Sequence, residues 1–502
     1  MKTVKKIIYS IMLASIFALP SCSDFLVVGP TNALPDHSAV VDVASARVAL
    51  HGVYLRLNTR FLFGTDMITY GDVRGDDMGT TRIGDRTQSP YRFMHTTAQT
   101  STNGGFFWRD FYNALARAND LMTRIESGDV RVNSPAEQTE LNSIYGQLLA
   151  LRALMHFQLV RIYGEPYLKN ADAPGVIIAY RVIRGHEKLQ RSTVRETYNF
   201  IVEDLQRALG RVGGTTYLRQ TICPTLSHAA FSYFAAEALL ARVFLHMGRW
   251  QDAYNSARNV IHNGPYSLIP TAQYVASWGL EFTTESIFEI HQSATSNADR
   301  ESIGYVFQPR SPNPAYGITV TGYGAVSATP QFIALMLQDP DDVRLGLMLP
   351  NDLGQAHAFV NKYPGRGGNI VVNNARVIRL SDVYLMAAEA GVMIGSPNAS
   401  TYLNAIRQRA NPNAAPVTAT IPLVMDERRR ELVGEGHRFF DIIRNLGTNT
   451  VTRGGTAGNP INQHNQVQVL SWDNEHTHLL ILPIPQVEID TNPDIYQNEG
   501  YN

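Results

Sequence analysis

Three carboxylates spaced four residues apart, Glu427, Glu431 and Glu435, form the pattern in this chain that most resembles catalytic chemistry. On one continuous helix they would share a face, and two such groups can act as general acid and general base. Catalysis also needs a cleft and environments that separate the two pKa values. Arginines are interleaved with them at helical spacing: Arg428, Arg430, Arg438 and Arg444. Ion pairs within and between helices explain this pattern more simply, so we interpret the segment as structural.

A second polar cluster lies in a glycine-rich N-terminal region and could contact a ligand directly. It comprises Asp72, Arg74, Asp76 and Asp77. The spacing does not fit an EF-hand calcium loop, which needs alternating oxygen ligands before its glycine. Two interpretations stay open: a solvated turn held by aspartate–backbone hydrogen bonds, or a polar ledge for a ligand.

A third group of candidate ligand residues follows directly in the chain. Thr97, Gln99 and Asn103 carry groups that donate and accept hydrogen bonds, which suits a peptide backbone and sugar hydroxyls equally. Trp108 starts an apolar helical stripe, so we place it in the core. Aromatic residues of a later segment could stack on a ligand or anchor their own loops: Trp278, Tyr305, Tyr316 and Tyr323.

The sequence contains no Walker motif, no G-x-S-x-G elbow and no H-E-x-x-H zinc motif. Gly322-Tyr323-Gly324 lacks the third glycine of a dinucleotide loop and is interpreted as a turn. His476 and His478 could chelate a metal only as a pair on one strand face, and two surface histidines are the commoner explanation. We therefore expect no metal and no cofactor.

Apolar residues recurring at helical spacing indicate a mostly α-helical protein with little β structure. We expect helices around Trp108–Ile125 and Leu141–Leu148, and at Val194–Ala208, Ala229–Met247, Trp250–His262, Arg379–Ile394, Thr401–Ala410 and Val424–Arg444. Two segments break the pattern, near residues 61–105 and 264–378, and are rich in glycine, proline and polar residues. Long irregular segments on a rigid scaffold are usually functional, so a binding site is expected there.

The helix pair around Gly248 matches a tetratricopeptide repeat in one register. Ala241 takes the small position of the first helix, Phe244 the aromatic position and Gly248 the turn. Ala253 takes the small position of the second helix, and Pro265 the terminal proline. The sequence therefore predicts a tetratricopeptide-like solenoid of helical hairpins that carries long loop-rich insertions.

Length and charge narrow the class of protein further. The chain has 502 residues, more than one core usually supports, which favours two lobes or a repeat architecture. Its formal net charge is −1, so a basic nucleic-acid-binding surface is not expected.

The N-terminus carries a targeting signal. Lysines precede the apolar run Ile7–Leu19, which is too short to span a bilayer, and Leu19-Pro20-Ser21-Cys22 resembles a lipobox. We expect residues 1–21 to be a lipoprotein signal peptide, 22–35 a lipidated tether beginning at Cys22, and 36–502 the binding domain. The other cysteine, Cys223, is interpreted as a buried thiol, because no base is placed beside it.

The C-terminal third contains the most distinctive sequence motifs. It includes Val377–Ala390, Asn404–Ala410, Asp426–Arg444, Leu479–Pro485, Glu488–Pro493 and Gln497–Tyr501. This ordered set resembles the SusD/RagB family of Bacteroidetes outer-membrane lipoproteins. The lipobox, the repeat near Gly248 and the helix from Leu151-Arg152-Ala153 to Tyr163-Gly164 belong to the same resemblance. The likeness covers nearly the whole chain and is greatest to the RagB branch.

The resemblance implies a helical, non-enzymatic protein on the cell surface, anchored to the outer membrane by lipid. Family members cap a TonB-dependent transporter of the SusC or RagA kind and act as its lid. The RagB branch implies oligopeptides as cargo, and other members bind glycans. In the peptide reading, Thr97, Gln99 and Asn103 would meet the backbone, while Asp72, Arg74 and Asp76 would meet the charged termini.

Three hypotheses therefore stand: a substrate-binding lipoprotein, a secreted hydrolase, and a repeat scaffold for protein–protein contact. The lipobox and the C-terminal motifs favour the substrate-binding lipoprotein. We expect oligopeptide capture, with glycan capture as the alternative.

The lipid anchor is directly testable. Cys22→Ala should release the protein from the membrane fraction, because the thiol that carries the lipid is lost. Stable tethering needs two or three acyl chains, since one chain binds only marginally. Membrane fractionation and mass spectrometry of the N-terminal peptide measure this, and a variant held as firmly as the wild type would contradict it.

Overall fold

The computed structural model describes residues 40–81, 87–97, 103–220, 228–311, 321–350, 358–446, 451–453, 468–472 and 477–501. Cys22, Gln99, Cys223, Tyr316 and His476 lie outside these residues. Within them, one hydrophobic core runs from Val40 near the start to Ile495 near the end.

Long helices form the N-terminal part of the scaffold: α2 (Val43–Leu57), α5 (Asn103–Glu126), α6 (Pro135–Tyr163), α7 (Val194–Ala208), α8 (Tyr233–His246) and α9 (Trp250–Asn263). Polar caps mark several of their starts. Asp42 and Ser45 form a reciprocal capping box at α2, and Thr193 and Glu196 form one at α7. These boxes satisfy N–H groups that a helix leaves unpaired at its first turn. The predicted bounds of α7 are confirmed.

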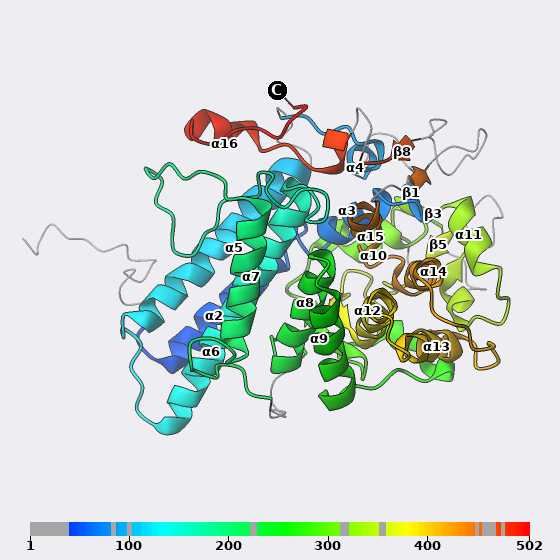
Figure 1. The fold of residues 1–502 in the computed structure, drawn as a ribbon, viewed down its shortest axis with the longest axis horizontal. Coiled ribbons are helices and arrows are strands. Elements are labelled where there is room, and N and C mark those ends of the chain that lie inside the picture. The colour runs from blue at the N-terminus through cyan, green and yellow to red at the C-terminus, as the bar shows by residue number, and fades with distance from the viewer. Residues whose placement is uncertain are drawn as a thin grey trace, which may run out of the picture.

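The helices pack on one another in chain order. α6 packs on α7, and α8 packs on α9; α9 then packs on α12 (Leu380–Met393), which packs on α13 (Ala399–Ala410). Figure 1 shows α5, α7, α8, α9, α12 and α13 following one another across the molecule. The predicted mostly α-helical, tetratricopeptide-like fold is confirmed.

The hairpin of α8 and α9 follows the predicted repeat register. Ala241 and Ala253 are fully buried, which lets the two helices approach closely. Gly248 lies in the turn with φ of +69°, a left-handed conformation that favours glycine. Phe244 is buried beside them, as the aromatic position requires.

The single helix expected over Val424–Arg444 is wrong. The structure has α14 (Ile421–Leu432) and α15 (Arg438–Asn445), separated by a turn. Gly434 and Gly436 in that turn have φ of +80° and +78°, which is incompatible with a continuing right-handed helix. Glu435 therefore does not continue the helical face of Glu427 and Glu431.

The two loop-rich segments contain short elements that the sequence did not predict. Their helices are α3 (Asp66–Val73), α4 (Gln88–Arg92), α10 (Ile303–Phe307) and α11 (Pro330–Met336), with 3-10 turns η4 (Thr271–Gln273), η5 (Ala276–Gly279), η6 (Asp299–Glu301) and η8 (Val343–Leu347). All eight residues of α3 are buried, so it has no apolar stripe that periodicity could detect.

Small antiparallel strand pairs complete the described structure. They are β1 (Met78–Thr80) with β3 (Val326–Ala328), β2 (Ser286–Ile290) with β6 (Ala375–Arg379), β4 (Met348–Leu349) with β5 (Phe359–Val360), and β7 (Val451–Arg453) with β8 (Gln468–Leu470). The pair β1–β3 joins the two loop-rich segments, which are more than two hundred residues apart in the chain. The expectation of little β structure is confirmed.

The C-terminal residues pack against the end of α6. They include η9 (Thr477–Leu480) and α16 (Gln486–Thr491). Leu482 N donates to Ile162 O at 2.8 Å, and the Asn498 amide donates to Tyr163 O at 2.9 Å. Some of the C-terminal motifs that resemble the family therefore serve to pack the chain end against α6. No helix of the described residues has both the length and the apolarity that crossing a bilayer requires.

A close approach between α3 and the α14–α15 turn gives a stability prediction. A Cβ on Gly71 would lie 2.1 Å from the Gly436 carbonyl oxygen, whereas a Cβ on Gly52 of α2 meets no atom within 4 Å. Gly71→Ala should therefore lower the free energy of unfolding by about 3 kcal/mol. Gly52→Ala, the matched control, should leave it unchanged or raise it by about 0.5–1 kcal/mol. Denaturant unfolding measures both, and equal stabilities would refute the close approach.

Candidate functional site

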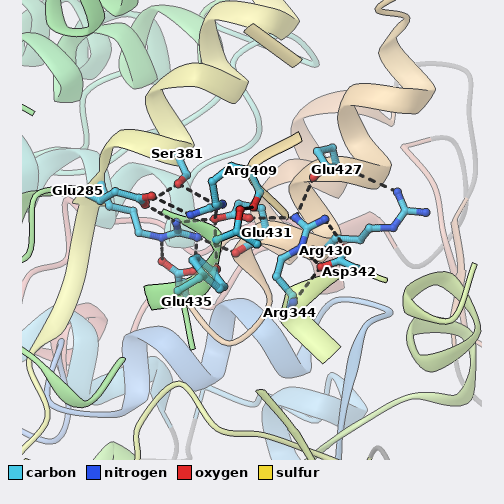
Figure 2. Close-up of polar contacts among 12 residues, drawn as sticks. Glu285, Asp342, Arg344, Ser381, Arg409, Glu427, Arg430, Glu431 and Glu435 are labelled. Carbon is cyan, nitrogen blue, oxygen red and sulfur yellow. Dashed lines mark hydrogen bonds and ion pairs between the residues drawn. The ribbon is translucent and has the colours of Figure 1, made fainter. Parts of the chain in front are cut away.

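The carboxylates that resemble a catalytic set lie at the centre of a buried ion cluster (Figure 2). Glu431 is fully buried and accepts hydrogen bonds from Arg379 Nη1 at 2.6 Å, Arg409 Nη2 at 2.5 Å and Arg344 Nη1 at 2.9 Å. The three arginines come from β6, α13 and η8. One carboxylate of α14 therefore ties three separate elements together.

The neighbouring carboxylates are paired in the same way. Glu427 accepts from Arg344 at 2.8 Å, and Glu435 accepts from Arg379 at 2.7 Å and from Lys362 Nζ at 2.7 Å. Glu285, directly before β2, accepts from Arg409 at 2.7 Å. Ion pairing therefore accounts for all three glutamates of the sequence pattern.

The pKa values of Glu431 and Glu435 do not suit an acid–base pair. Burial alone would raise them, but the pairing arginines outweigh it: the pKa of Glu431 is held well below its ordinary value, and that of Glu435 is lowered to about 2. A general acid needs a raised pKa beside an ionised partner. Both glutamates stay ionised at neutral pH, so the cluster is architectural.

The acidic cluster predicted as a ligand ledge instead fixes strand β1. Asp77 accepts from Arg429 of α14 at 2.8 Å, and Asp76 accepts two hydrogen bonds from Arg438 of α15 at 2.5 and 2.9 Å. Burial raises the pKa of Asp76, but Arg438 outweighs it and keeps the pKa below its ordinary value. Thr329 N donates to Asp77 O at 2.8 Å and so holds the end of β3 beside them.

Asp72 and Arg74 lie inside the protein and form no surface ledge. Asp72 is 1% exposed, and burial raises the pKa of its carboxyl well above the ordinary value. Arg74 is fully buried, lies over the rings of Phe93 and Phe439 at 4.1 and 4.5 Å, and donates to Leu479 O. The open interpretation as a solvated turn is also wrong for both residues, because their neighbours exclude solvent.

Of the other predicted ligand residues, Thr97 is the one whose side chain is described. Thr97 is half-buried, and its carbonyl oxygen accepts from Gln486 N at the start of α16 at 3.2 Å. Asn103 begins α5, but its side chain, like all of Gln99, lies outside the described residues. Trp108 is 2% exposed, which confirms its place in the core.

Of the loop aromatics, Tyr305 and Tyr323 come together at the junction of the two loop-rich segments. Their ring centroids are 5.4 Å apart with 38° between the planes, and both residues are half-buried. Trp278 differs: it is buried, and the cations of Arg376 and Lys362 lie 4.1 and 4.6 Å from its ring. Trp278 is thus a packing anchor, while Tyr305 and Tyr323 are only partly buried.

Backbone hydrogen bonds set the tyrosine pair in place. Tyr323 N donates to Tyr305 O at 2.5 Å, and Ala325 N donates to Val306 O at 2.9 Å. Thr81, directly after β1, donates its N–H to Ala325 O at 3.0 Å. In Figure 1, β1 and β3 lie side by side close to α10, the helix that carries Tyr305. The clamp on Asp76 and Asp77 therefore also positions this aromatic pair.

Two further residues beside the pair were not predicted. The exposed Arg310 donates its Nε–H to Tyr323 O at 2.9 Å, and the Thr81 hydroxyl donates to Gly324 O. The glycines around Tyr323 were the available sequence signal: a Cβ on Gly322 would lie 2.6 Å from Tyr305 O. The predicted turn is not found here: although Gly324 has φ of +52°, Gly322 N donates to Pro309 O and Gly324 N donates to Gln308 O, both at 2.7 Å, so the segment lies along residues 308–309.

Half-buried rings beside hydrogen-bonding groups, on a helical-repeat scaffold, are compatible with ligand binding. Two family models match the chain: one described as SusD family over residues 354–501, and one described as starch-binding associating with outer membrane over residues 63–245. A SusD superfamily protein from Bacteroides thetaiotaomicron is 31% identical, covers 91% of this chain and all of its own, and superposes with a TM-score of 0.80. The chain belongs to the SusD family.

Two other relatives have named ligands. The starch-binding protein SusD of Bacteroides thetaiotaomicron is 33% identical over 131 residues, which are 25% of this chain and 21% of that protein. A laminarin-binding SusD-like protein is 24% identical, with a TM-score of 0.69 over 92% of this chain and all of its own, a likeness that shows the shared fold. The closer likeness to RagB stays a prediction.

The ion cluster gives a pH-dependent prediction. Because the pKa of Glu435 falls from 4.5 to about 2 on folding, its contribution to stability is complete above pH 4.5 and is lost as the pH falls through about 2. Glu435→Gln should lower the free energy of unfolding at pH 7 by about 3–5 kcal/mol, since Lys362 and Arg379 lose a buried partner.

The loss caused by Glu435→Gln should shrink between pH 4.5 and 2, as the wild type itself becomes protonated. Glu203→Gln, on the exposed face of α7, is the control and should change little. Denaturant unfolding at several pH values measures this; a loss of constant size across that range would contradict the assignment.

Proposed function

We propose that this protein captures carbohydrate at the outer membrane, with the Tyr305–Tyr323 pair as its ligand platform. The observation that carries the proposal is this pair of half-buried rings, 5.4 Å apart, at the meeting point of both loop-rich segments. Sugar rings present C–H faces that pack on aromatic rings, and their hydroxyls suit the Thr81 hydroxyl and the Arg310 guanidinium.

Carbohydrate is favoured over the expected oligopeptide for two reasons. The family description and the named relatives refer to starch and laminarin. In addition, the residues expected to meet peptide termini are occupied: Asp72 and Arg74 are buried, and Asp76 is paired with Arg438. Oligopeptide capture is therefore the second candidate.

The proposal includes the lipid anchor at Cys22, exposure at the cell surface and a TonB-dependent transporter as partner. The lipobox at Leu19–Cys22 supports the anchor, and the family description supports association with the outer membrane. In this arrangement the protein binds substrate and does not cleave it, which agrees with the ionised, fully paired state of Glu431 and Glu435.

Calorimetry of the mature protein with starch oligosaccharides, laminarin oligosaccharides and mixed peptides tests the ligand class. Tyr305→Ala and Tyr323→Ala should each weaken carbohydrate binding about tenfold or more, since loss of an aromatic contact costs roughly 0.5–1.5 kcal/mol beyond the lost burial. Tyr180→Ala, an exposed tyrosine of the helical part, should bind like the wild type.

Peptide binding without carbohydrate binding would overturn the ligand class. Equal carbohydrate affinity in all three tyrosine variants would move the site elsewhere. Product analysis after long incubation completes the experiment, because cleaved oligosaccharide would contradict the binding-only role.

A further inference from the structure

A large pocket lies on the helical part of the scaffold. It is bordered by α2, the first half of α6, the start of α8, β2 and the connecting residues 217–220, 228–232 and 265–266. Its volume is about 1340 Å³, whereas small-molecule sites usually have roughly 300–1,000 Å³, so it has room for an oligomeric ligand. Neither Tyr305 nor Tyr323 lines it, and in Figure 1 α2 lies on the other side of α8 from β1 and β3. The pocket is therefore separate from the proposed platform.

Partly buried aromatic residues line this pocket from four separate segments. They are Tyr54, Tyr217, Tyr233 and Tyr266. Buried apolar side chains also line it, and exposed residues such as Leu55 and Arg219 mark where the pocket opens to solvent. Aromatic rings in such a pocket can pack on the C–H faces of sugar rings, while their hydroxyls reach polar groups.

One tyrosine hydroxyl ties three walls of the pocket together. Tyr54 of α2 donates its O–H to the Gln147 amide oxygen of α6 at 2.9 Å, and it accepts from Phe231 N, just before α8, at 2.9 Å. The ring of Tyr54 also lies near that of Phe288 in β2, with centroids 6.3 Å apart. The fold therefore shapes the pocket before any ligand arrives, which lowers the entropy cost of binding.

A glycine inside α6 accounts for the position of Tyr217. A Cβ on Gly146 would lie 2.7 Å from the Tyr217 Cβ and 2.9 Å from the Leu218 Cγ. Glycine within a helix is destabilising relative to alanine, so the close approach of residues 217–218 explains this one. The ring of Tyr217 lies against that of Tyr145, with centroids 4.8 Å apart, and its hydroxyl has no hydrogen-bond partner among the described residues. That hydroxyl is available to a ligand.

A strained residue supports another wall of the pocket. Phe282 has φ of +52°, a left-handed conformation that a non-glycine residue rarely adopts. Its ring lies near those of His228 and His291, two lining residues, with centroids 6.0 and 5.8 Å away and planes inclined by 18° and 27°. His228 Nδ1 donates to Ser286 O at 2.5 Å, so the neutral ring keeps Nε2 as an acceptor. Strain of this kind is commonest at binding and active sites, where the surrounding structure holds it.

The polar groups that line this pocket suit sugar hydroxyls better than peptide charges. Glu140 is the one acidic residue of the described lining, and it accepts from Arg47 Nε at 2.5 Å. An amino terminus or a lysine would therefore find no free carboxylate. The side chains of Arg219 and Gln220 are exposed and have no hydrogen bond or ion pair within the part of the chain that the structure describes. Together with Tyr217 they offer donors and acceptors to hydroxyl groups.

We propose that this pocket is a second saccharide site, which holds an oligosaccharide against Tyr54, Tyr217 and Tyr266 while Arg219 and Gln220 donate to its hydroxyls. The ligand class rests on the proposed function, but the position of the pocket and its residues do not. The protein thus binds saccharide at two separate places, one in the loop-rich region and one on the helical repeats.

Calorimetry on a protein without the platform isolates the pocket. The double variant Tyr305→Ala/Tyr323→Ala should still bind starch or laminarin oligosaccharides. Adding Tyr217→Ala should weaken this residual binding about tenfold or more, because an aromatic face is lost. Adding Arg219→Ala with Gln220→Ala should weaken it about threefold or more, and these exposed side chains have no hydrogen bond or ion pair among the described residues whose loss would unfold the protein. Tyr180→Ala and Arg117→Ala, exposed residues outside the pocket, are the matched controls and should leave it unchanged.

A crystal structure of the wild type with the same oligosaccharides does not depend on a variant folding. It should show saccharide density against Tyr54 and Tyr217. If the wild type binds oligosaccharide, but the pocket is empty in the crystals and removal of Tyr305 and Tyr323 abolishes all binding, this inference is wrong and the proposed function stands. Unchanged residual affinity after Tyr217→Ala would also overturn the inference. If the wild type binds none of the oligosaccharides, both are wrong.

Discussion

Burial of the Glu431 carboxylate is the constraint on which much of this structure depends. An ionised carboxylate removed from water costs several kcal/mol unless charged hydrogen bonds replace its hydration. Glu431 has no exposed surface, and Arg344, Arg379 and Arg409 supply those bonds. Each arginine comes from a different element, so the acid is stable only when η8, β6 and α13 are all in place. The need to pair one buried carboxylate thus fixes how three separate elements are placed.

The same use of charge extends from this cluster to the proposed platform. Arg429 and Arg438, on either side of the glycine turn, hold Asp77 and Asp76. These aspartates precede β1, β1 pairs with β3, and the segment before β3 carries Tyr323. The position of an exterior tyrosine therefore depends on buried ion pairs. Loops that would otherwise be mobile gain a defined geometry in this way, which lowers the entropy cost of binding.

Architecture and the proposed recognition site use different chemistry in this protein. Glu431 and Glu435 accept hydrogen bonds from arginine and lysine donors, and their burial keeps them from a substrate. Tyr305 and Tyr323, the proposed platform, are instead uncharged and only partly buried. This separation suits a protein that holds an uncharged ligand by packing and hydrogen bonds. It also explains why a charge-rich helix can resemble an active site without acting as one.

The sequence by itself determined the class of structure, because helical periodicity and small residues act locally. The bounds of α7 follow from an apolar stripe and a capping box, and the hairpin of α8 and α9 follows from Ala241, Gly248 and Ala253. Trp108 was placed in the core for the same reason. The ordered C-terminal motifs were sufficient to predict the family.

Only the tertiary structure decided which of the candidate site residues are buried and which a ligand could reach. Asp72, Arg74 and Asp76 are polar residues in a glycine-rich stretch, and nothing local distinguishes a solvated ledge from a buried clamp. Their partners, Arg438 and Leu479, lie more than three hundred residues away. The break between α14 and α15 has the same origin, since Gly436 must leave the helix to lie against Gly71. Long-range contacts set burial, burial sets which polar groups a ligand can reach, and periodicity carries no information about either.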